Sequence, residues 1–320
     1  MAKVLLLGAG FSRNWGGPLA AEMFDWLLQK PEIESDQRLR QLLWDNKGGG
    51  GFENALSQVQ ADYLQSSIPD NKARLERFQA AVNAVFADMD QGFASLPTWE
   101  FQNDSGRQLV SAFVKFDAIF TLNQDLLFER FYINENVSLV SRQQWNGCVM
   151  PGMRALAGAA IPYDVGQTIW TPDAAQFSVP AHCQPYFKLH GSYRWEDGTG
   201  NRLMVMGGSK AVMIRQHAVL AWYFSEFQRY LGMGGTKLMV MGYGFGDHHV
   251  NETIMAAQER DLKMFIVDPL GVDVANPDRG LPLQRENPFK HVIVGASKRG
   301  LRETFGNDVI EHGRLMQFLA

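Results

Sequence analysis

The stretch VLLLGAGFSRNWGGP, residues 4 to 18, joins four aliphatic side chains directly to a glycine-rich turn. An aliphatic run bounded by glycine predicts a buried strand of a parallel sheet. Gly8 and Gly10 permit backbone angles that a side chain forbids, so the chain can turn tightly and approach a ligand. We expect a helix from about Pro18, whose free N–H groups would face the turn and seat a phosphate. The stretch therefore predicts a nucleotide pocket. The alternative is a turn that only packs a helix on the sheet, because a full GxGxxG with a following acidic residue is absent from the sequence.

The composition is that of an ordinary globular protein, with 46% hydrophobic and 20% charged residues among 320. A net charge of −4 gives no global electrostatic reason to bind nucleic acid or an anionic membrane. The sequence has no apolar run of the roughly 18 to 20 residues that a membrane span needs. The start MAKVLLLGAG lacks the pattern of a signal peptide, so we expect a cytoplasmic protein. Two cysteines, Cys148 and Cys183, can build neither a disulfide framework nor a four-cysteine zinc site.

Six apolar stretches at intervals of helix length predict an α/β fold, a Rossmann-like parallel sheet with helices on both faces. The predicted strands are 4–7, 118–121, 186–189, 238–241, 264–267 and 292–294. The first five end in the steps GAGFS, LNQD, HGS, GYGFGD and DP. Ligands on such sheets bind where the carboxyl ends of the strands open into loops. Five polar or glycine-rich loops at one edge therefore predict one site.

The intervals between the predicted strands are unequal, which indicates additions to the sheet. Residues 19–115 are predicted to be a helical insertion, with helical patterns over 18–29, 52–64 and 72–89. Residues 134–185 are rich in Pro, Gly, Ala and Gln, and are predicted to be a loop-rich cap over the pocket. We expect residues 1–320 to form a single domain that carries both additions.

Taken in order, GAGFSRNWGGP, TLNQD, KLHGS, GYGFGD and FIVDP resemble the Sir2 (sirtuin-like) family. They are most similar to its bacterial SIR2-like branch, which consumes NAD rather than deacylating proteins. The resemblance spans residues 8–268 and is specific only at these segments. Sirtuin deacylases usually carry four zinc-binding cysteines, and an arginine after the proline that follows the first turn. This chain has two cysteines, and GGPLAAEM lacks that arginine. The resemblance therefore implies NAD as the substrate, without a zinc module or another metal.

The resemblance implies two catalytic residues. His190, in YFKLHGS, would be the general base that acts on the nicotinamide ribose, because an imidazole titrates near neutrality. Asn123, in TLNQD, would orient the ribose and the attacking water, a positioning role that suits a fixed amide. The alternatives are a core histidine bonded to backbone and an asparagine that caps a helix. Asp125 is expected to hold the nicotinamide end, a role compatible with capping the helix that follows.

The predicted contacts to the pyrophosphate lie in the first glycine turn. Gly8, Ala9, Gly10 and Ser12 are expected to line it through backbone N–H groups and one hydroxyl. Phe11 is expected to cover the nicotinamide ribose, and its alternative role is packing into the core.

Further predicted contacts follow the fourth and fifth strands. Gly242, Tyr243 and Gly244 repeat the close approach to the ligand, whereas Asp247 is ambiguous because it can cap the next helix. Asp268 is expected to accept hydrogen bonds from the adenosine ribose, with a simple turn before a proline as the alternative.

The adjacent histidines His248 and His249 raise the question of a metal site. Neighbouring side chains on a helix diverge, and no carboxylate-rich ligand spacing accompanies the pair. We therefore expect no metal site.

The resemblance implies an NAD glycohydrolase that acts in bacterial antiphage defence by depleting NAD once triggered. It also implies a homo-oligomer, or a partner such as a HerA-like ATPase or an Argonaute-type sensor, and no direct contact with nucleic acid. Two alternatives remain: an NAD-dependent protein deacylase, and a non-catalytic module that binds NAD or ADP-ribose. A nicotinamide dehydrogenase is more distant, because the sequence has neither the dinucleotide fingerprint nor a second substrate module.

Overall fold

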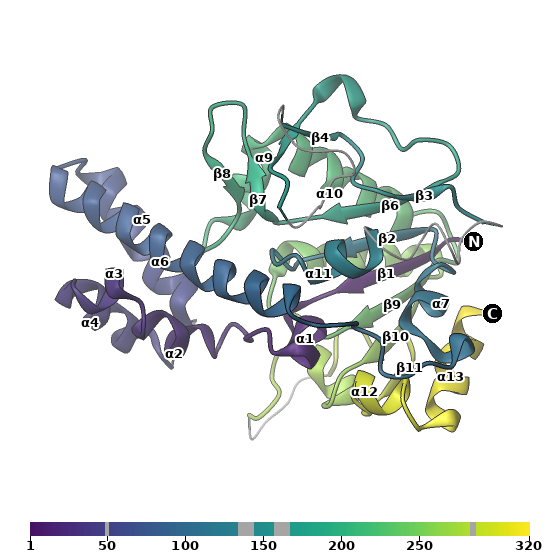
Figure 1. The fold of residues 1–320 in the computed structure, drawn as a ribbon. Coiled ribbons are helices and arrows are strands. Elements are labelled where there is room, and N and C mark those ends of the chain that lie inside the picture. Colours follow the sequence, from purple (N-terminus) through teal and green to yellow (C-terminus); the bar gives the residue numbers. More distant parts are fainter. Residues whose placement is uncertain (49–50, 134–143, 157–166, 282–285) are drawn as a thin grey trace.

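The computed structural model describes residues 1–48, 51–133, 144–156, 167–281 and 286–320. Its main feature is a seven-stranded parallel sheet of β1 (Lys3–Leu7), β2 (Ala118–Thr121), β3 (Gly147–Val149), β6 (Cys183–Lys188), β9 (Lys237–Met241), β10 (Lys263–Val267) and β11 (Ile293–Ser297). The strand order is β11-β10-β9-β1-β2-β6-β3, with helices packed on both faces (Figure 1). The predicted Rossmann-like α/β fold and its six strands are confirmed, with small shifts at the strand ends.

The sequence analysis missed β3 and a second sheet. The second sheet has the order β4-β5-β7-β8, with β4 (Met153–Ala155), β5 (Trp170–Pro172), β7 (Gly191–Glu196) and β8 (Arg202–Met204). Strands of three residues are too short to show an alternating pattern. The second sheet begins its β7 directly after His190, so the segment KLHGS joins the two sheets.

Several helices pack around the two sheets or lie between strands 1 and 2. They are α1 (Ala9–Ser12), α2 (Met23–Leu28), α3 (Pro31–Glu34), α4 (Gln37–Asn46), α5 (Gly51–Gln65), α6 (Pro69–Ala94), α7 (Leu109–Phe113), α9 (Lys210–Gln216), α10 (Ala218–Leu231), α11 (His248–Ala256), α12 (Leu301–Thr304) and α13 (Val309–Leu319). In Figure 1, α3 to α6 extend from the sheet as an arm. The predicted helices over 52–64 and 72–89 correspond to α5 and α6 and are confirmed.

The helix predicted over 18–29 is present as α2 (Met23–Leu28), but its predicted start at Pro18 is wrong. The chain turns into α1 at Ala9, continues as a short 3-10 helix over Arg13–Trp15, and stops at Gly16, whose φ is 95°. The next helix, α2, begins only at Met23. Glycine adopts a positive φ without steric cost, so the helical segment ends at Gly16-Gly17, before the proline.

The division into an insertion and a cap stays a prediction. The described residues between 19 and 115 contain α2 to α7. In the predicted cap, residues 134–143 and 157–166 lie outside the described residues. The described part of that segment contains β3, β4, β5 and the start of β6.

Successive side chains along one strand face opposite sides of the main sheet, whereas register partners on neighbouring strands face the same side. Phe120 of β2 and its register partner Phe187 of β6 face α10, where Phe120 contacts Phe227. Tyr186, one residue earlier in β6, faces the other side and stacks on Phe128. The core therefore continues through the sheet on both faces.

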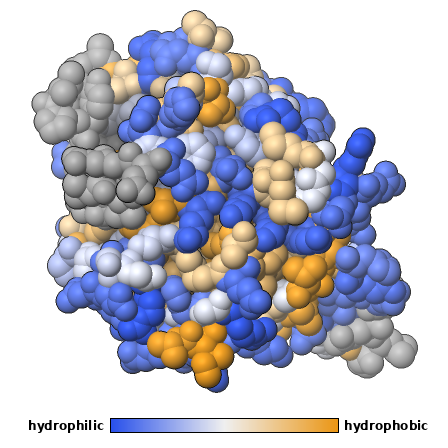
Figure 2. All heavy atoms as spheres, turned by 90° about the vertical axis from the view of Figure 1, so that its right-hand side faces the viewer, coloured by the Kyte–Doolittle hydropathy of each residue, from blue (hydrophilic) through white to orange (hydrophobic). Residues whose placement is uncertain are grey.

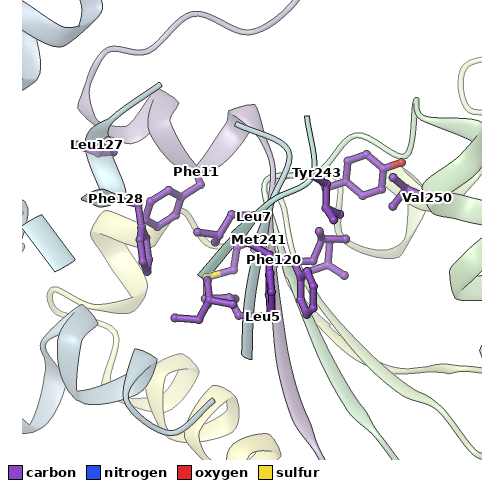
Figure 3. Close-up of a cluster of buried hydrophobic side chains, with 14 of the residues drawn as sticks. Leu5, Leu7, Phe11, Phe120, Leu127, Phe128, Met241, Tyr243 and Val250 are labelled. Carbon is purple, nitrogen blue, oxygen red and sulfur yellow. The ribbon is translucent and has the colours of Figure 1, made fainter. Parts of the chain in front are cut away.

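The close-up in Figure 3 shows this division next to the glycine turn. Phe11 lies beside Phe128 on one side of the strands, and Tyr243 lies beside Val250 on the other. All four side chains are at least nine-tenths buried. Aliphatic side chains from β1 and β9 fill the space between them. The turns that follow β1 and β9 therefore pack side chains into the hydrophobic core.

The amino-terminal edge of the sheet lies on the side of the two chain ends (Figure 1). Figure 2 views the molecule from that side and shows a largely hydrophilic face with separate apolar patches. In the described part of the chain, none of the helices is both long and apolar enough to cross a bilayer.

The turns after β1 and β9 touch backbone to backbone. A Cβ added to Gly8 would lie 2.6 Å from Gly242 O, and a Cβ added to Gly242 would overlap Phe11 N. Gly242 also has a φ of 65°, in the left-handed region. Both positions therefore require glycine.

We expect Gly242→Ala to lower the free energy of unfolding by about 2 to 4 kcal/mol, because it adds backbone strain and a steric overlap. Gly244→Ala is the matched control, because a Cβ there would meet no atom within 4 Å among the described residues. We expect the control to change stability by less than about 1 kcal/mol. Urea unfolding followed by circular dichroism measures both, and equal midpoints would contradict the tight contact.

Candidate functional site

The predicted site residues lie at one edge of the main sheet. The strand order changes direction at β1, which pairs with β2 on one side and β9 on the other. Crevices for ligands form outside the carboxyl ends of strands at such a point. The Leu189 N–H donates to Thr121 O at 2.9 Å, so the segments that follow β6 and β2 run side by side. The segments that contain His190 and Asn123 therefore follow neighbouring strands at the same edge of the sheet.

The backbone of the glycine turn is bonded to the end of β9. The Gly8 N–H donates to Met241 O at 3.0 Å, and the Gly10 N–H donates to Gly242 O at 2.9 Å. These two N–H groups are therefore already bonded, and the contact of the turn with a pyrophosphate stays a prediction. Both N–H groups point at the neighbouring turn, because glycine at positions 8, 10 and 242 lets the two backbones meet. Ala9 is exposed at the tip of the turn.

Asn123 is held by the glycine turn. Its Nδ2 donates to Gly8 O at 3.0 Å and to Ser12 Oγ at 3.0 Å. The Ser12 hydroxyl donates in turn to Asp125 Oδ2 at 2.8 Å. The other carboxylate oxygen of Asp125 accepts from the Leu127 N–H at 3.0 Å, as a helix cap does. The Asn123 amide, the Ser12 hydroxyl and the Asp125 carboxylate thus form a continuous chain of hydrogen bonds. Asp125 has the capping role that was expected to be compatible with its predicted one.

A buried ion pair lies beneath this chain of hydrogen bonds. Lys188 of β6 donates to Glu129 and to the backbone oxygen of Asp125, and the ammonium and Glu129 are both fully buried. Burial raises the pKa of Glu129 and of Asp125, and the Lys188 charge opposes that rise. Breaking such a pair leaves an uncompensated buried charge. Lys188 therefore holds the segment that carries Asn123, a role that the sequence analysis missed.

His190 is buried beside a second histidine. His190 is 3% exposed, and its Nε2 lies 3.1 Å from Nε2 of His249. Burial lowers the pKa of His190 to about 3, and Asp247 partly opposes that shift. The pKa of His249 is also lowered by burial. Both imidazoles are therefore neutral near pH 7, and one donates to the other.

Asp247 connects His190 to a distant helix. Its Oδ1 accepts from Lys210 Nζ at 2.8 Å, and the same ammonium lies 2.9 Å from Glu53 Oε1 of α5. Burial disfavours the charged form of Asp247, but the pKa of its carboxyl is lowered, and the charge and hydrogen bond of Lys210 contribute to that lowering. Asp247 stands at the N-terminus of α11, yet its carboxylate pairs with Lys210 instead of capping that helix. A row of charged groups thus runs from α5 to the histidine pair.

The remaining predicted contacts have structural partners. Tyr243 donates from its hydroxyl to Asn251 Oδ1 at 2.9 Å, which ties the glycine loop to α11. Phe11 is 1% exposed and packs against Trp15 and Phe113, the core position that was its alternative.

Two predicted contacts lie nearer the surface. Gly244 is exposed in the loop after β9. Asp268 follows β10, where its Oδ1 accepts from the Leu270 N–H at 2.9 Å, as expected of a turn residue. The predicted contacts of Gly244 and Asp268 with a ligand stay predictions.

Two cavities lie near these elements. One of about 290 Å³ is lined by His249, Phe224 and residues of α9 and α10. The other, an open hollow of about 640 Å³, lies between α4 and α6. The residues that line these two cavities do not include Asn123 or His190. Ser12 and His190 are buried, whereas Asn123 is partly exposed.

Neither the search of protein-family models nor that of curated proteins found a match to this chain. Among solved structures, the chain is similar to a complex of a mutant Sir2 homologue with ADP-ribose (12% identity, 99% of this chain and 91% of that chain, TM-score 0.42). It is also similar to a complex of mutant Sir2 homologues with 2′-O-acetyl ADP-ribose (12%, 99% and 93%, 0.43). A third is a complex of a Sir2 homologue with NAD (11%, 99% and 90%, 0.35). At these values the likeness carries no functional assignment.

We expect the stability of the protein to fall with acidification because of His190. Its pKa is about 3 in the folded chain and roughly 6.5 in an unfolded one. Between these values only the unfolded state binds the proton. The contribution to stability is therefore complete above pH 6.5 and lost progressively below it, by about 2 kcal/mol between pH 7 and pH 5.

Urea unfolding of the wild type and His190→Gln at pH 7 and pH 5 measures this loss. His190→Gln should lose less stability than the wild type over the interval. His248→Gln is the control, because the His248 side chain is 84% exposed. Equal losses in all three proteins would contradict the lowered pKa.

Proposed function

We propose that this chain is an NAD glycohydrolase, which cleaves NAD to nicotinamide and ADP-ribose. The observation that supports the proposal most is the fixed amide of Asn123 at the glycine turn, with His190 at the end of the neighbouring strand. The order of the segments GAGFS, TLNQD, KLHGS, GYGFGD and FIVDP, which resembles the Sir2 family, adds to this support.

In this proposal NAD lies across the carboxyl ends of the strands. The pyrophosphate sits over the first glycine turn, near the exposed Ala9. The adenosine end extends towards Asp268 beyond β10, and the nicotinamide ribose lies between Asn123 and His190.

The reaction breaks the bond between C1′ of the ribose and the pyridinium nitrogen. Both electrons of the bond go to that nitrogen, so neutral nicotinamide leaves without being protonated. Water then forms a bond to C1′, and its proton passes to the neutral imidazole of His190. The Asn123 amide, held by two hydrogen bonds, orients the ribose and the water. Positioning of the ribose and the water, and stabilisation of the charge that develops on the sugar, lower the barrier most.

The burial of His190 means that NAD reaches the imidazole only after neighbouring segments move. This supports an enzyme that is silent until triggered, and the charged row from Glu53 to Asp247 is one route by which α5 can affect the site. The antiphage role, the cytoplasmic location, the homo-oligomer and a HerA-like or Argonaute-type partner all stay predictions of the resemblance.

We expect His190→Ala and Asn123→Ala each to lower the rate of nicotinamide release at least about 100-fold, because each removes a group that acts on the reacting sugar. Nicotinamide and ADP-ribose are measured by chromatography after incubation of the purified protein with NAD, alone and with the products of neighbouring genes. His248→Ala should leave the rate unchanged, since that side chain is exposed.

Three outcomes would count against the proposal. Full activity of both variants would refute the two roles. Release of O-acyl-ADP-ribose from an acylated peptide would identify a deacylase. NAD binding without NAD loss under every condition would favour the binding module.

A further inference from the structure

Two imidazoles and one carboxylate converge at the end of β6. The ligand atoms of His190, His249 and Asp247 all lie within 4.8 Å of one another. We propose that these three side chains bind a divalent transition-metal ion with the preferences of Zn²⁺.

The two nitrogens already have the separation that a metal needs. In a tetrahedral site with Zn–N bonds of about 2.0 to 2.1 Å, two ligand nitrogens lie roughly 3.3 Å apart. The two Nε2 atoms are 3.1 Å apart. In the metal-free pair one of these nitrogens must carry a hydrogen, whereas a bound metal would use both lone pairs. The Asp247 oxygen lies within 4.8 Å of both nitrogens, so it must move closer by up to about 1.5 Å to complete a set of three.

The three ligands are carried by ordered elements. His190 lies between β6 and β7, and its backbone oxygen accepts from the Val205 N–H at 2.9 Å. Asp247 and His249 belong to the first turn of α11, where Tyr243 and Asn251 tie the loop to the helix. Such support limits the rearrangement that binding requires.

The local charges are compatible with a cation. Lys210 opposes it, but the ammonium is shared by Asp247 and Glu53, so two carboxylates surround one positive charge. The Lys210 ammonium contacts Oδ1 of Asp247 at 2.8 Å. Two imidazoles and one carboxylate favour Zn²⁺ and its neighbours over Mg²⁺ and Ca²⁺, which prefer oxygen ligands. Three protein ligands leave a fourth position for water.

The sequence analysis missed this site because it considered His248 with His249. The two side chains do diverge: His248 pairs with Glu252 at the surface, whereas His249 points to His190. The third ligand, His190, comes from the segment between β6 and β7, 59 positions before His249.

One consequence rests on the proposed function. A metal bound to Nε2 of His190 would occupy the lone pair that accepts a proton during hydrolysis. Metal binding would therefore hold the enzyme inactive, and removal of the metal would release it.

The test uses the full chain, stripped of metal with a chelator and then titrated with Co²⁺ or Zn²⁺. We expect one ion per chain, a visible d–d absorption for Co²⁺, and its displacement by Zn²⁺. His249→Ala and Asp247→Asn should each weaken binding about 100-fold. His248→Ala is the matched control and should bind as the wild type does. Far-ultraviolet circular dichroism checks that each variant is folded.

Three results would overturn the site. The first is no saturable binding by the wild type at micromolar metal. The second is equal affinity of the wild type and a folded Asp247→Asn or His249→Ala variant. The third is a thiolate charge-transfer band with Co²⁺, which would assign the ion to the cysteines.

A separate measurement addresses the consequence. Zn²⁺ should inhibit nicotinamide release by the wild type and His248→Ala at the concentration at which it binds. Metal binding is measured without NAD, so the two proposals fail separately. Absence of hydrolysis by metal-free protein, both alone and with the products of neighbouring genes, would refute the proposed function alone. Active protein that binds no metal would refute the metal site alone.

Discussion

The backbone contact between two glycine turns is the constraint on which the site depends. Gly8 and Gly10 donate hydrogen bonds to the end of β9, and the space between the turns is too small for a Cβ at Gly8, Gly10 or Gly242. This contact places the carbonyl of Gly8 and the hydroxyl of Ser12 where the Asn123 amide can donate to both. A side chain at any of the three glycines would separate β1 from β9 and release the amide.

The buried polar groups around the site are satisfied in two separate sets. Lys188 and Glu129 lie beneath the segment that carries Asn123, whereas Lys210 joins Asp247 to Glu53 near His190. A buried charge without a partner is costly, so each set restrains the elements that contribute to it. The first set is made by β6 and the segment after β2, close to the sheet. The second reaches α5 in the extended arm, so movement of the arm and the state of the histidine pair are physically linked.

Much of the fold and part of the site could be predicted from the sequence. Aliphatic runs ending in glycine or polar steps revealed six strands of the main sheet, because buried parallel strands are continuously apolar. The same steps identified Asn123, Asp125 and His190 as strand-end residues. The start of the helix predicted from Pro18 was wrong, because the pattern of local residues does not show that Gly16 adopts a positive φ. The cluster of His190, His249 and Asp247 and the Glu53–Lys210–Asp247 row were missed, since their members are far apart in the chain.

The sequence by itself determined the type of sheet, the positions of its main strands and the residues at their carboxyl ends. These depend on local hydrophobicity and on the conformational freedom of glycine, which the order of residues expresses directly. Only the tertiary structure decided that the N–H groups of Gly8 and Gly10 bond to the β9 turn and that Phe11 packs in the core. It also decided that His249 faces His190 while His248 faces solvent. The reason is that hydrogen-bond partners, burial and the pKa of an imidazole depend on which distant segments the folded chain brings together.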